Sequence, residues 1–122
     1  MKLFVYGTLR KGDSRSFLLD DIDECKFIKY IHTAPQYTLV SLAAFPALLE
    51  KGDTKVMGEL WEIDERTKRH LDVIEGVPTL YMDKEIVLED GTTAIAYVQE
   101  FDRGYPIIES GDWFTHKAEK QN

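Results

Sequence analysis

Hydrophobic residues along this chain occur in short runs and alternations, a spacing that is typical of β-strands. The first run, Leu3–Tyr6, consists of bulky and β-branched residues and predicts a strand that is buried on both faces in the middle of a sheet. Similar runs predict further strands within residues 25–42, where Pro35 marks a bend between two strands, and at 56–63, 80–88 and 93–101.

One segment between the predicted strands is typical of a helix. Asp64 can cap residues 65–75 at their N-terminal end, because its side chain can accept a hydrogen bond from a free backbone N–H. Gly76 can adopt the left-handed conformation that ends helices, and Pro78 prevents continuation. We therefore expect a short helix that ends at or next to Glu75.

Strands outnumber helices, which predicts the α+β class, with a mostly β barrel or strongly curled sheet as the core and one or two short helices. The length of 122 residues predicts a single domain over residues 1–122. Apolar residues after Asp102 are expected to dock on the body of the protein. The charged end, from about 115 to 122, is expected to be frayed.

Turn residues separate the predicted elements. Asp90 and Gly91 between two alternating runs predict a hairpin, and residues 51–53 predict a turn. Gly58 inside a strand indicates a bulge or a close backbone approach. The apolar loop 44–47 is expected to pack either over the barrel end or as the wall of a pocket, and both interpretations stay open.

Charge and hydropathy argue against some classes of binding partner. The chain has 15 basic and 22 acidic residues, and the net charge of −7 argues against nucleic acid. Its apolar stretches are far shorter than the roughly 20 residues that cross a bilayer, and its start lacks the apolar core of a signal peptide. A cytoplasmic protein without membrane contact is expected. The single cysteine, Cys25, is predicted to be structural.

The first predicted strand stops abruptly at Gly7, Thr8 and Leu9. A loop that begins with glycine at a strand end can turn its backbone N–H groups toward an anion, because no Cβ blocks the approach. The alternative is an ordinary exit from the strand with a solvated basic tip. In that tip Arg10 and Lys11 are exposed charges, although they could also steer an anionic substrate.

Glu75 is the second residue of interest. It follows Leu71 by four positions, so its side chain is expected on or beside the buried face of the helix, at the last turn. Burial and the negative end of the helix dipole both disfavour a charged carboxylate there and should raise its pKa, which suits proton transfer. The alternative is a glutamate that points to water at a frayed helix end.

The other polar and aromatic residues are weaker candidates for a catalytic or binding role. The histidines have no metal-ligand spacing, and no metal site is predicted. Asp72 is expected to cap or pair near the helix surface, and Asp112 is expected to lie in a turn. Trp61 and Trp113 are predicted to be packing residues.

These residues together carry a resemblance. The run from Phe4 to Arg10, residues 58–61, the run from Leu71 to Gly76, and Tyr81 resemble the γ-glutamylcyclotransferase superfamily, in particular its small AIG2-like branch. The resemblance spans most of the chain. It implies a compact mixed barrel in which the glycine loop faces a cavity that holds a catalytic glutamate, here Glu75. Tyr6, Gly7, Thr8 and Leu9 would then bind substrate, and Tyr81 would line the pocket or lie in the core with its hydroxyl at the rim.

The resemblance also implies a reaction. In a γ-glutamyl amine or dipeptide, the α-amine attacks the side-chain carbonyl of the same molecule and closes the ring of 5-oxoproline, which expels an amine. Such an intramolecular attack requires substrate folding and proton transfer but no cofactor. The second hypothesis is a non-catalytic member of the same fold that binds a small ligand or a partner, because fold alone does not determine activity. The oligomeric state stays open.

Overall fold

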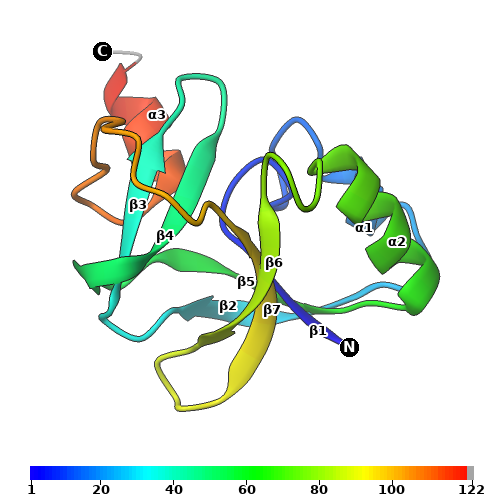
Figure 1. The fold of residues 1–122 in the computed structure, drawn as a ribbon. Helices are drawn as coiled ribbons and strands as arrows, with labels where there is room; N and C mark the ends of the chain where they lie inside the picture. Colours follow the sequence, from blue (N-terminus) through cyan, green and yellow to red (C-terminus); the bar gives the residue numbers. More distant parts are fainter. Residues whose placement is uncertain (121–122) are drawn as a thin grey trace.

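The structure, a computed structural model, describes residues 1–120 and places strand β1 (Lys2–Val5) inside a sheet. β1 lies between β5 (Met57–Glu62), which is antiparallel, and β7 (Thr93–Val98), which is parallel (Figure 1). Leu3, Phe4 and Val5 are at most 3% exposed. The predicted buried strand in the middle of a sheet is confirmed.

The strands form one mixed, seven-stranded sheet, which with its helices confirms the α+β class. Its hydrogen-bonded order is β2-β5-β1-β7-β4-β3, and β6 pairs with β7 beside this path. Among the described residues no strand pairing joins β2 to β3, so the closed barrel stays a prediction. The remaining elements are β2 (Lys26–His32), β3 (Tyr37–Ser41), β4 (Pro46–Thr54), β6 (Met82–Val87), α1 (Phe17–Asp20), α2 (Glu65–Ile74) and α3 (Trp113–Lys120).

The turn that was expected at residues 51–53 is wrong, because β4 continues through it to Thr54. The pairing of β4 with β3 shifts register there, from Leu49 opposite Thr38 to Thr54 opposite Tyr37. The intervening residues form a bulge that absorbs the turn-forming sequence without ending the strand. The last strand is shorter than predicted and ends at Val98 rather than at 101.

Alternation along the sheet divides the core into two clusters. Phe4 packs with Trp113 and Leu39 in one cluster, whereas Leu3 packs with Trp61 in the other. Successive side chains of a strand point to opposite faces, so β1 contributes to both. Both tryptophans are 2% exposed, which confirms their predicted packing role.

Gly58 permits a close approach between β5 and β1. A Cβ at this position would lie 2.4 Å from both Cζ of Phe4 and the carbonyl oxygen of Val5. Of the two predicted explanations for this glycine, the close backbone approach is therefore confirmed. Cys25 is buried, with its thiol 3.5 Å from Oγ1 of Thr67.

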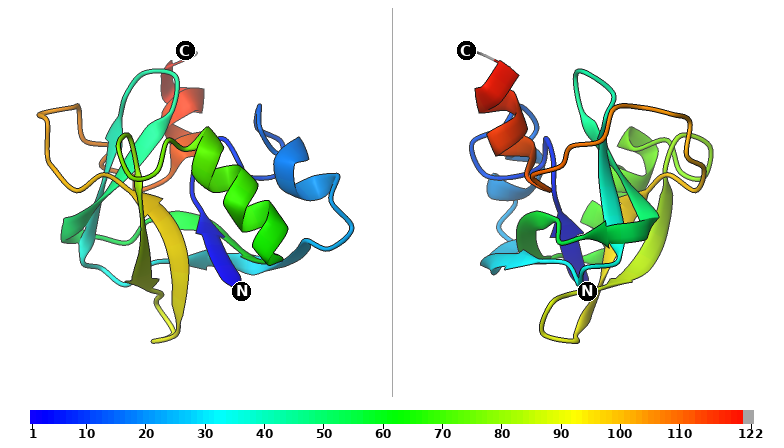
Figure 2. Two further views of the ribbon diagram at one scale, coloured as in Figure 1. Left: turned by 45° about the vertical axis from the view of Figure 1, so that its right-hand side comes forward. Right: turned by 90° about the vertical axis from the view of Figure 1, so that its left-hand side faces the viewer.

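The chain end differs from the prediction. Residues 115–120, which were predicted to be frayed, belong to helix α3 (Trp113–Lys120), so the described chain has three helices rather than one or two. Residues 121 and 122 of the predicted frayed tail lie outside the described residues. Figure 2 shows α3 beside the loop that follows β1. No helix within residues 1–120 is long and apolar enough to cross a membrane.

Candidate active site

A cavity of about 160 Å³ opens where β1 ends and the glycine loop begins. Six separate parts of the chain form it: the end of β1 with the following loop, the approach to α1, the start of β4, the end of α2, the segment just before β6, and β7. The lining residues are Phe4, Val5, Tyr6, Gly7, Thr8, Leu9, Arg15, Phe45, Pro46, Ile74, Glu75, Leu80, Tyr81 and Tyr97. All six residues predicted for the site are among them.

Gly7, Thr8 and Leu9, here called the glycine loop, form one side of the cavity. The loop is closed by hydrogen bonds from the Arg10 N–H to the Gly7 carbonyl oxygen and from the Arg15 N–H to the Thr8 carbonyl oxygen. None of the residues 1–120 accepts a hydrogen bond from the backbone N–H groups of the glycine loop itself. Donors without a partner beside a cavity are suited to bind a carboxylate or an oxyanion.

Glycine at position 7 is required by packing. A Cβ there would lie 2.7 Å from Cγ of Pro46 and 2.8 Å from its Cδ. The glycine loop can therefore approach the wall made by Phe45 and Pro46 only without a side chain at this position. Of the two interpretations of the apolar loop 44–47, the structure supports the wall of a pocket.

The capping of α2 at both of its ends determines where Glu75 lies. The helix begins at Asp64, whose side chain accepts a hydrogen bond from the Thr67 N–H, and Glu75 is its last capping residue. The chain then turns through Gly76 at φ 66°, with hydrogen bonds from the Gly76 N–H to the Val73 carbonyl oxygen and from the Val77 N–H to that of Asp72. This is the Schellman arrangement that ends many helices. It confirms the helix and its stop as predicted.

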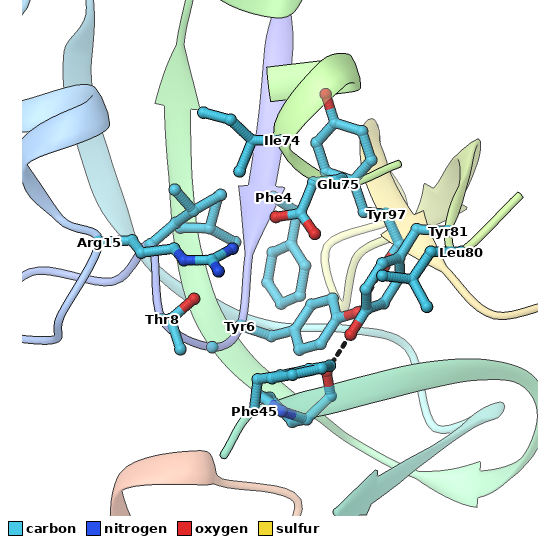
Figure 3. A pocket seen from close by; sticks show the side chains of 14 residues that line it. Phe4, Tyr6, Thr8, Arg15, Phe45, Ile74, Glu75, Leu80, Tyr81 and Tyr97 are labelled. Atoms are coloured by element: carbon cyan, nitrogen blue, oxygen red, sulfur yellow. Dashed lines mark hydrogen bonds between the residues drawn. The ribbon is translucent and has the colours of Figure 1, made fainter. Parts of the chain in front are cut away.

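Burial and charge act on Glu75 in opposite directions. Its carboxyl group is partly buried in the cavity, and this loss of hydration raises its pKa above the ordinary value of 4.5. The positive charge of Arg15 lowers the pKa in part, but the net direction is upward. The predicted rise in pKa and its cause in burial are confirmed, whereas the predicted contribution of the helix dipole stays a prediction. Figure 3 shows Arg15 and Glu75 reaching into the same space from opposite sides.

The two predicted tyrosines line the cavity with hydroxyl groups that are already bonded. The Tyr81 hydroxyl donates a hydrogen bond to the Pro46 carbonyl oxygen at 2.8 Å (Figure 3). The Tyr6 hydroxyl donates to the backbone carbonyl oxygen of Tyr97 and accepts from the Leu48 N–H. Burial raises the pKa of both phenols, so they stay neutral. Tyr81 is 5% exposed and is thus both a core and a cavity residue. These rings form walls of fixed position.

Arg15 is the cavity residue that the sequence patterns did not indicate. Its position depends on the fold of the loop after β1, where its N–H bonds back to Thr8. No local pattern distinguishes it from other exposed arginines. Tyr97 and Leu80 were expected only as strand residues, and their place in the lining likewise depends on how the hairpin packs against α2.

Arg10 is not the exposed loop charge that was expected. It is 5% exposed and forms an ion pair with Asp112 at 2.9 Å, with its Nε 3.7 Å from the buried Glu59. Its guanidinium group lies over the ring of Phe114, 3.9 Å from the centroid. Lys11 is only partly exposed, and its N–H donates to Glu59. Arg10 thus ties the glycine loop to α3 from behind and does not line the cavity.

A second connection joins the same two segments. Asp13 accepts hydrogen bonds from Nε1 of Trp113 at 3.0 Å and from Nζ of Lys117 at 2.8 Å. Asp112 also accepts from the Phe114 N–H at the start of α3, so it is more than a turn residue. Trp113 docks on the body of the protein, as expected for the apolar residues after Asp102, and Lys117 from the segment predicted to be frayed adds a further contact to the loop after β1.

The remaining candidates lie outside the cavity. Asp72 pairs with Lys68 at 2.6 Å and accepts from the Tyr97 hydroxyl, which confirms its predicted pairing. Within residues 1–120, no cluster of three or more His, Cys, Asp or Glu side chains could hold a metal ion. Glu75 and Arg15 are thus the charged residues of a lining that is otherwise made of Thr8, three tyrosines and apolar residues.

One cavity of this α+β protein thus holds a glutamate whose pKa is raised and a glycine loop whose N–H groups have no acceptor within residues 1–120. A titratable group with a shifted pKa in a cavity is typical of a functional site. The comparison with known proteins identifies the family. Residues 3–115 match the family described as "Gamma-glutamyl cyclotransferase, AIG2-like". The chain belongs to this family.

Individual relatives agree with this assignment. A Vibrio cholerae protein named "Putative gamma-glutamylcyclotransferase" is 40% identical over 111 residues, which cover 91% of this chain and 93% of the relative. A Danio rerio protein named "Gamma-glutamylaminecyclotransferase B" is 34% identical over 71% of this chain and 49% of its own length. The crystal structure of an AIG2-like protein from Mus musculus superposes with a TM-score of 0.76 at 27% identity and covers 91% of this chain and 87% of that one.

Proposed function

We propose that this protein is a γ-glutamyl cyclotransferase that converts a γ-glutamyl amine or dipeptide to 5-oxoproline and a free amine. The observation that carries the proposal is that Glu75, whose pKa is raised, and the glycine loop with its free N–H groups line one cavity. Membership of the family and the names of the relatives support the same reaction class.

In the reaction, the α-nitrogen of the substrate attacks the γ-carbonyl carbon of the same molecule. A carbon–nitrogen bond forms in the five-membered ring, and the bond from that carbon to the leaving nitrogen breaks. The α-ammonium group loses two protons and the leaving amine gains two, so the reaction requires no net proton. Glu75 takes protons from the α-nitrogen and delivers them to the leaving nitrogen, a role that a carboxylate with a raised pKa can fill.

The glycine loop and the tyrosine walls supply orientation. The N–H groups of Gly7, Thr8 and Leu9 bind the α-carboxylate of the substrate or the oxyanion that develops on the γ-carbonyl. Tyr6 and Tyr81 enclose the substrate and exclude water, so that it is held in a folded conformation. Since attack is intramolecular, this positioning is a large part of the acceleration.

The test is incubation with a panel of γ-glutamyl amines and dipeptides, with 5-oxoproline measured as product. We expect turnover by the wild type and a loss of at least about 100-fold in Glu75→Gln, because a single acid–base group contributes about 100- to 10,000-fold. Equal turnover by this variant would exclude Glu75 as the proton carrier. If no member of the panel is cyclised but ligands still bind in the cavity, the protein is a binding member of the same fold.

A further inference from the structure

Arg15 is the only lysine or arginine among the described residues that line the cavity. Its backbone is fixed by hydrogen bonds from its N–H to Thr8 and from the Leu18 N–H to its carbonyl oxygen, at 2.9 and 3.1 Å. Its side chain forms no ion pair within residues 1–120, in contrast to Arg10 and Lys11 on the same loop. A guanidinium group that faces a cavity, and that acts on Glu75 only through its charge without an ion pair or hydrogen bond, is suited to bind an anion.

The small size of the cavity indicates that the γ-glutamyl unit and the leaving group of the substrate occupy different places. At about 160 Å³ it is smaller than the ~300–1,000 Å³ of sites that enclose whole drug-sized ligands. In the proposed reaction the γ-glutamyl unit lies between Glu75 and the glycine loop, where the ring closes. The leaving group therefore extends toward the mouth of the cavity, where exposed side chains lie.

Arg15 and Leu80 are the exposed side chains of the lining. Arg15 belongs to the segment before α1, opposite Glu75 across the cavity (Figure 3), so it can contact a group that extends outward from the γ-carbonyl. The N–H groups of the glycine loop have no acceptor within residues 1–120 and are available for the α-carboxylate of the substrate. The guanidinium group is thus left for a second anion on the substrate.

We propose that Arg15 selects substrates whose leaving amine carries a carboxylate of its own, as an amino acid does, over substrates with a neutral or cationic leaving amine. This inference rests on the proposed function and adds the substrate class. Arg15 binds the leaving-group carboxylate through charge-assisted hydrogen bonds and so determines specificity without taking part in proton transfer.

A neighbouring hollow offers a competing position for the same carboxylate. It shares Leu80 and Tyr81 with the cavity and is lined by Gln99 and Arg103. Arg103 lines only this second hollow and Arg15 lines only the first, so the two arginines can be distinguished by substitution.

The experiment compares two matched substrates, γ-glutamyl-alanine and γ-glutamyl-alaninamide, which differ only in whether the leaving group ends in a carboxylate or a neutral amide. We expect kcat/KM of the wild type to be about tenfold higher for the acid, a typical effect of one charge-assisted hydrogen bond at an exposed site. Alaninamide is the weaker base and the better leaving group, so chemical reactivity alone would give the opposite preference.

Arg15→Gln should reduce this preference to within about twofold, and Arg15→Lys should keep part of it. Arg69→Gln is the matched control, because Arg69 is exposed on α2 and does not line the cavity. It should keep the full preference. A second readout is direct binding of γ-glutamyl-alanine to the Glu75→Gln variant, which should weaken when Arg15→Gln is added, whereas binding of the amide should not change.

The outcomes separate this inference from the proposed function. If both substrates are cyclised equally by the wild type, or if Arg103→Gln rather than Arg15→Gln abolishes the preference, the role of Arg15 is overturned while the cyclotransferase activity stands. If neither substrate nor any γ-glutamyl amine is cyclised, the proposed function is overturned and the inference with it.

Discussion

Nη1 of Arg10 lies 2.9 Å from Oδ1 of Asp112, and this ion pair joins residues that are 102 positions apart in the sequence. Arg10 directly follows the glycine loop, and Asp112 directly precedes α3. The pair therefore connects the last helix of the chain to the loop that lines the cavity. Substrate contacts the front of this loop in the proposed reaction, while α3 supports it from behind.

Asp112→Asn should lower the free energy of unfolding. Removing one partner of a buried ion pair costs ~3–5 kcal/mol. We expect about 1–2 kcal/mol here, because Asp112 is 27% exposed and Arg10 keeps Glu59 as a neighbour. Urea denaturation at neutral pH measures the difference. Glu109→Gln, an exposed acid in the same segment, should have no measurable effect.

The effect of Asp112 also depends on pH. Burial acts to raise the pKa of Asp112, but the hydrogen bond and charge of Arg10 outweigh it and lower the pKa below the ordinary 3.8. A lowered pKa in the folded state contributes stability above pH 3.8 that is lost as pH falls through the folded value. The difference in the free energy of unfolding between wild type and Asp112→Asn should therefore become smaller below pH 3.8. A difference that stays constant with pH would contradict this account.

Gly7→Ala should impair turnover more than stability. The added Cβ would lie 2.7 Å from the Pro46 ring, so the glycine loop must move away from the cavity wall. A displacement on the order of 1 Å in a positioning group can cost about 100-fold, and we expect kcat/KM to fall by about 10- to 100-fold.

Gly104→Ala is the matched control for this change. Nothing lies within 4 Å of the position that a Cβ would take at Gly104, which does not line the cavity. Its φ of 76° disfavours a side chain, so the variant should lose some stability but turn over substrate normally. If Gly7→Ala retained full kcat/KM, the close approach to Pro46 would have no part in positioning the glycine loop.

Glu75→Gln should stabilise the protein at neutral pH. The pKa of Glu75 is raised by burial, so its charged form is less favourable in the folded than in the unfolded chain. This penalty is absent below the ordinary value of 4.5 and is complete above the folded pKa. Thermal unfolding of the variant and the wild type should differ at pH 7 and converge below 4.5. A variant that is less stable at pH 7 would show that the carboxylate has a stabilising partner.

Arg15→Gln should shift the pH profile of catalysis. The positive charge of Arg15 lowers the pKa of Glu75, so its removal lets that pKa rise. The pH profile of kcat/KM reports pKa values of the free enzyme, and its acidic limb should then move to higher pH. Arg69→Gln should leave the limb unchanged. A shift to lower pH in Arg15→Gln would mean that the limb belongs to a group other than Glu75.

Local sequence signals predicted the elements that carry most of the candidate site. The cap at Asp64 and the stop at Gly76 locate the end of α2, because capping depends on hydrogen bonds within a few residues. The apolar run that ends at Gly7 likewise locates the strand and its loop. The turn expected at 51–53 failed because pairing with β3 carries the strand past turn-forming residues.

The sequence by itself determined the α+β class, the helix that ends at Glu75 and the loop that begins at Gly7, since each follows from hydrophobic spacing and capping chemistry over short distances. Only the tertiary structure decided that Arg10 is buried against Asp112 and that Arg15 and Pro46 line the same cavity as Glu75. Burial and electrostatic contacts between distant segments depend on how the sheet folds, and no local pattern of residues encodes which side chains meet.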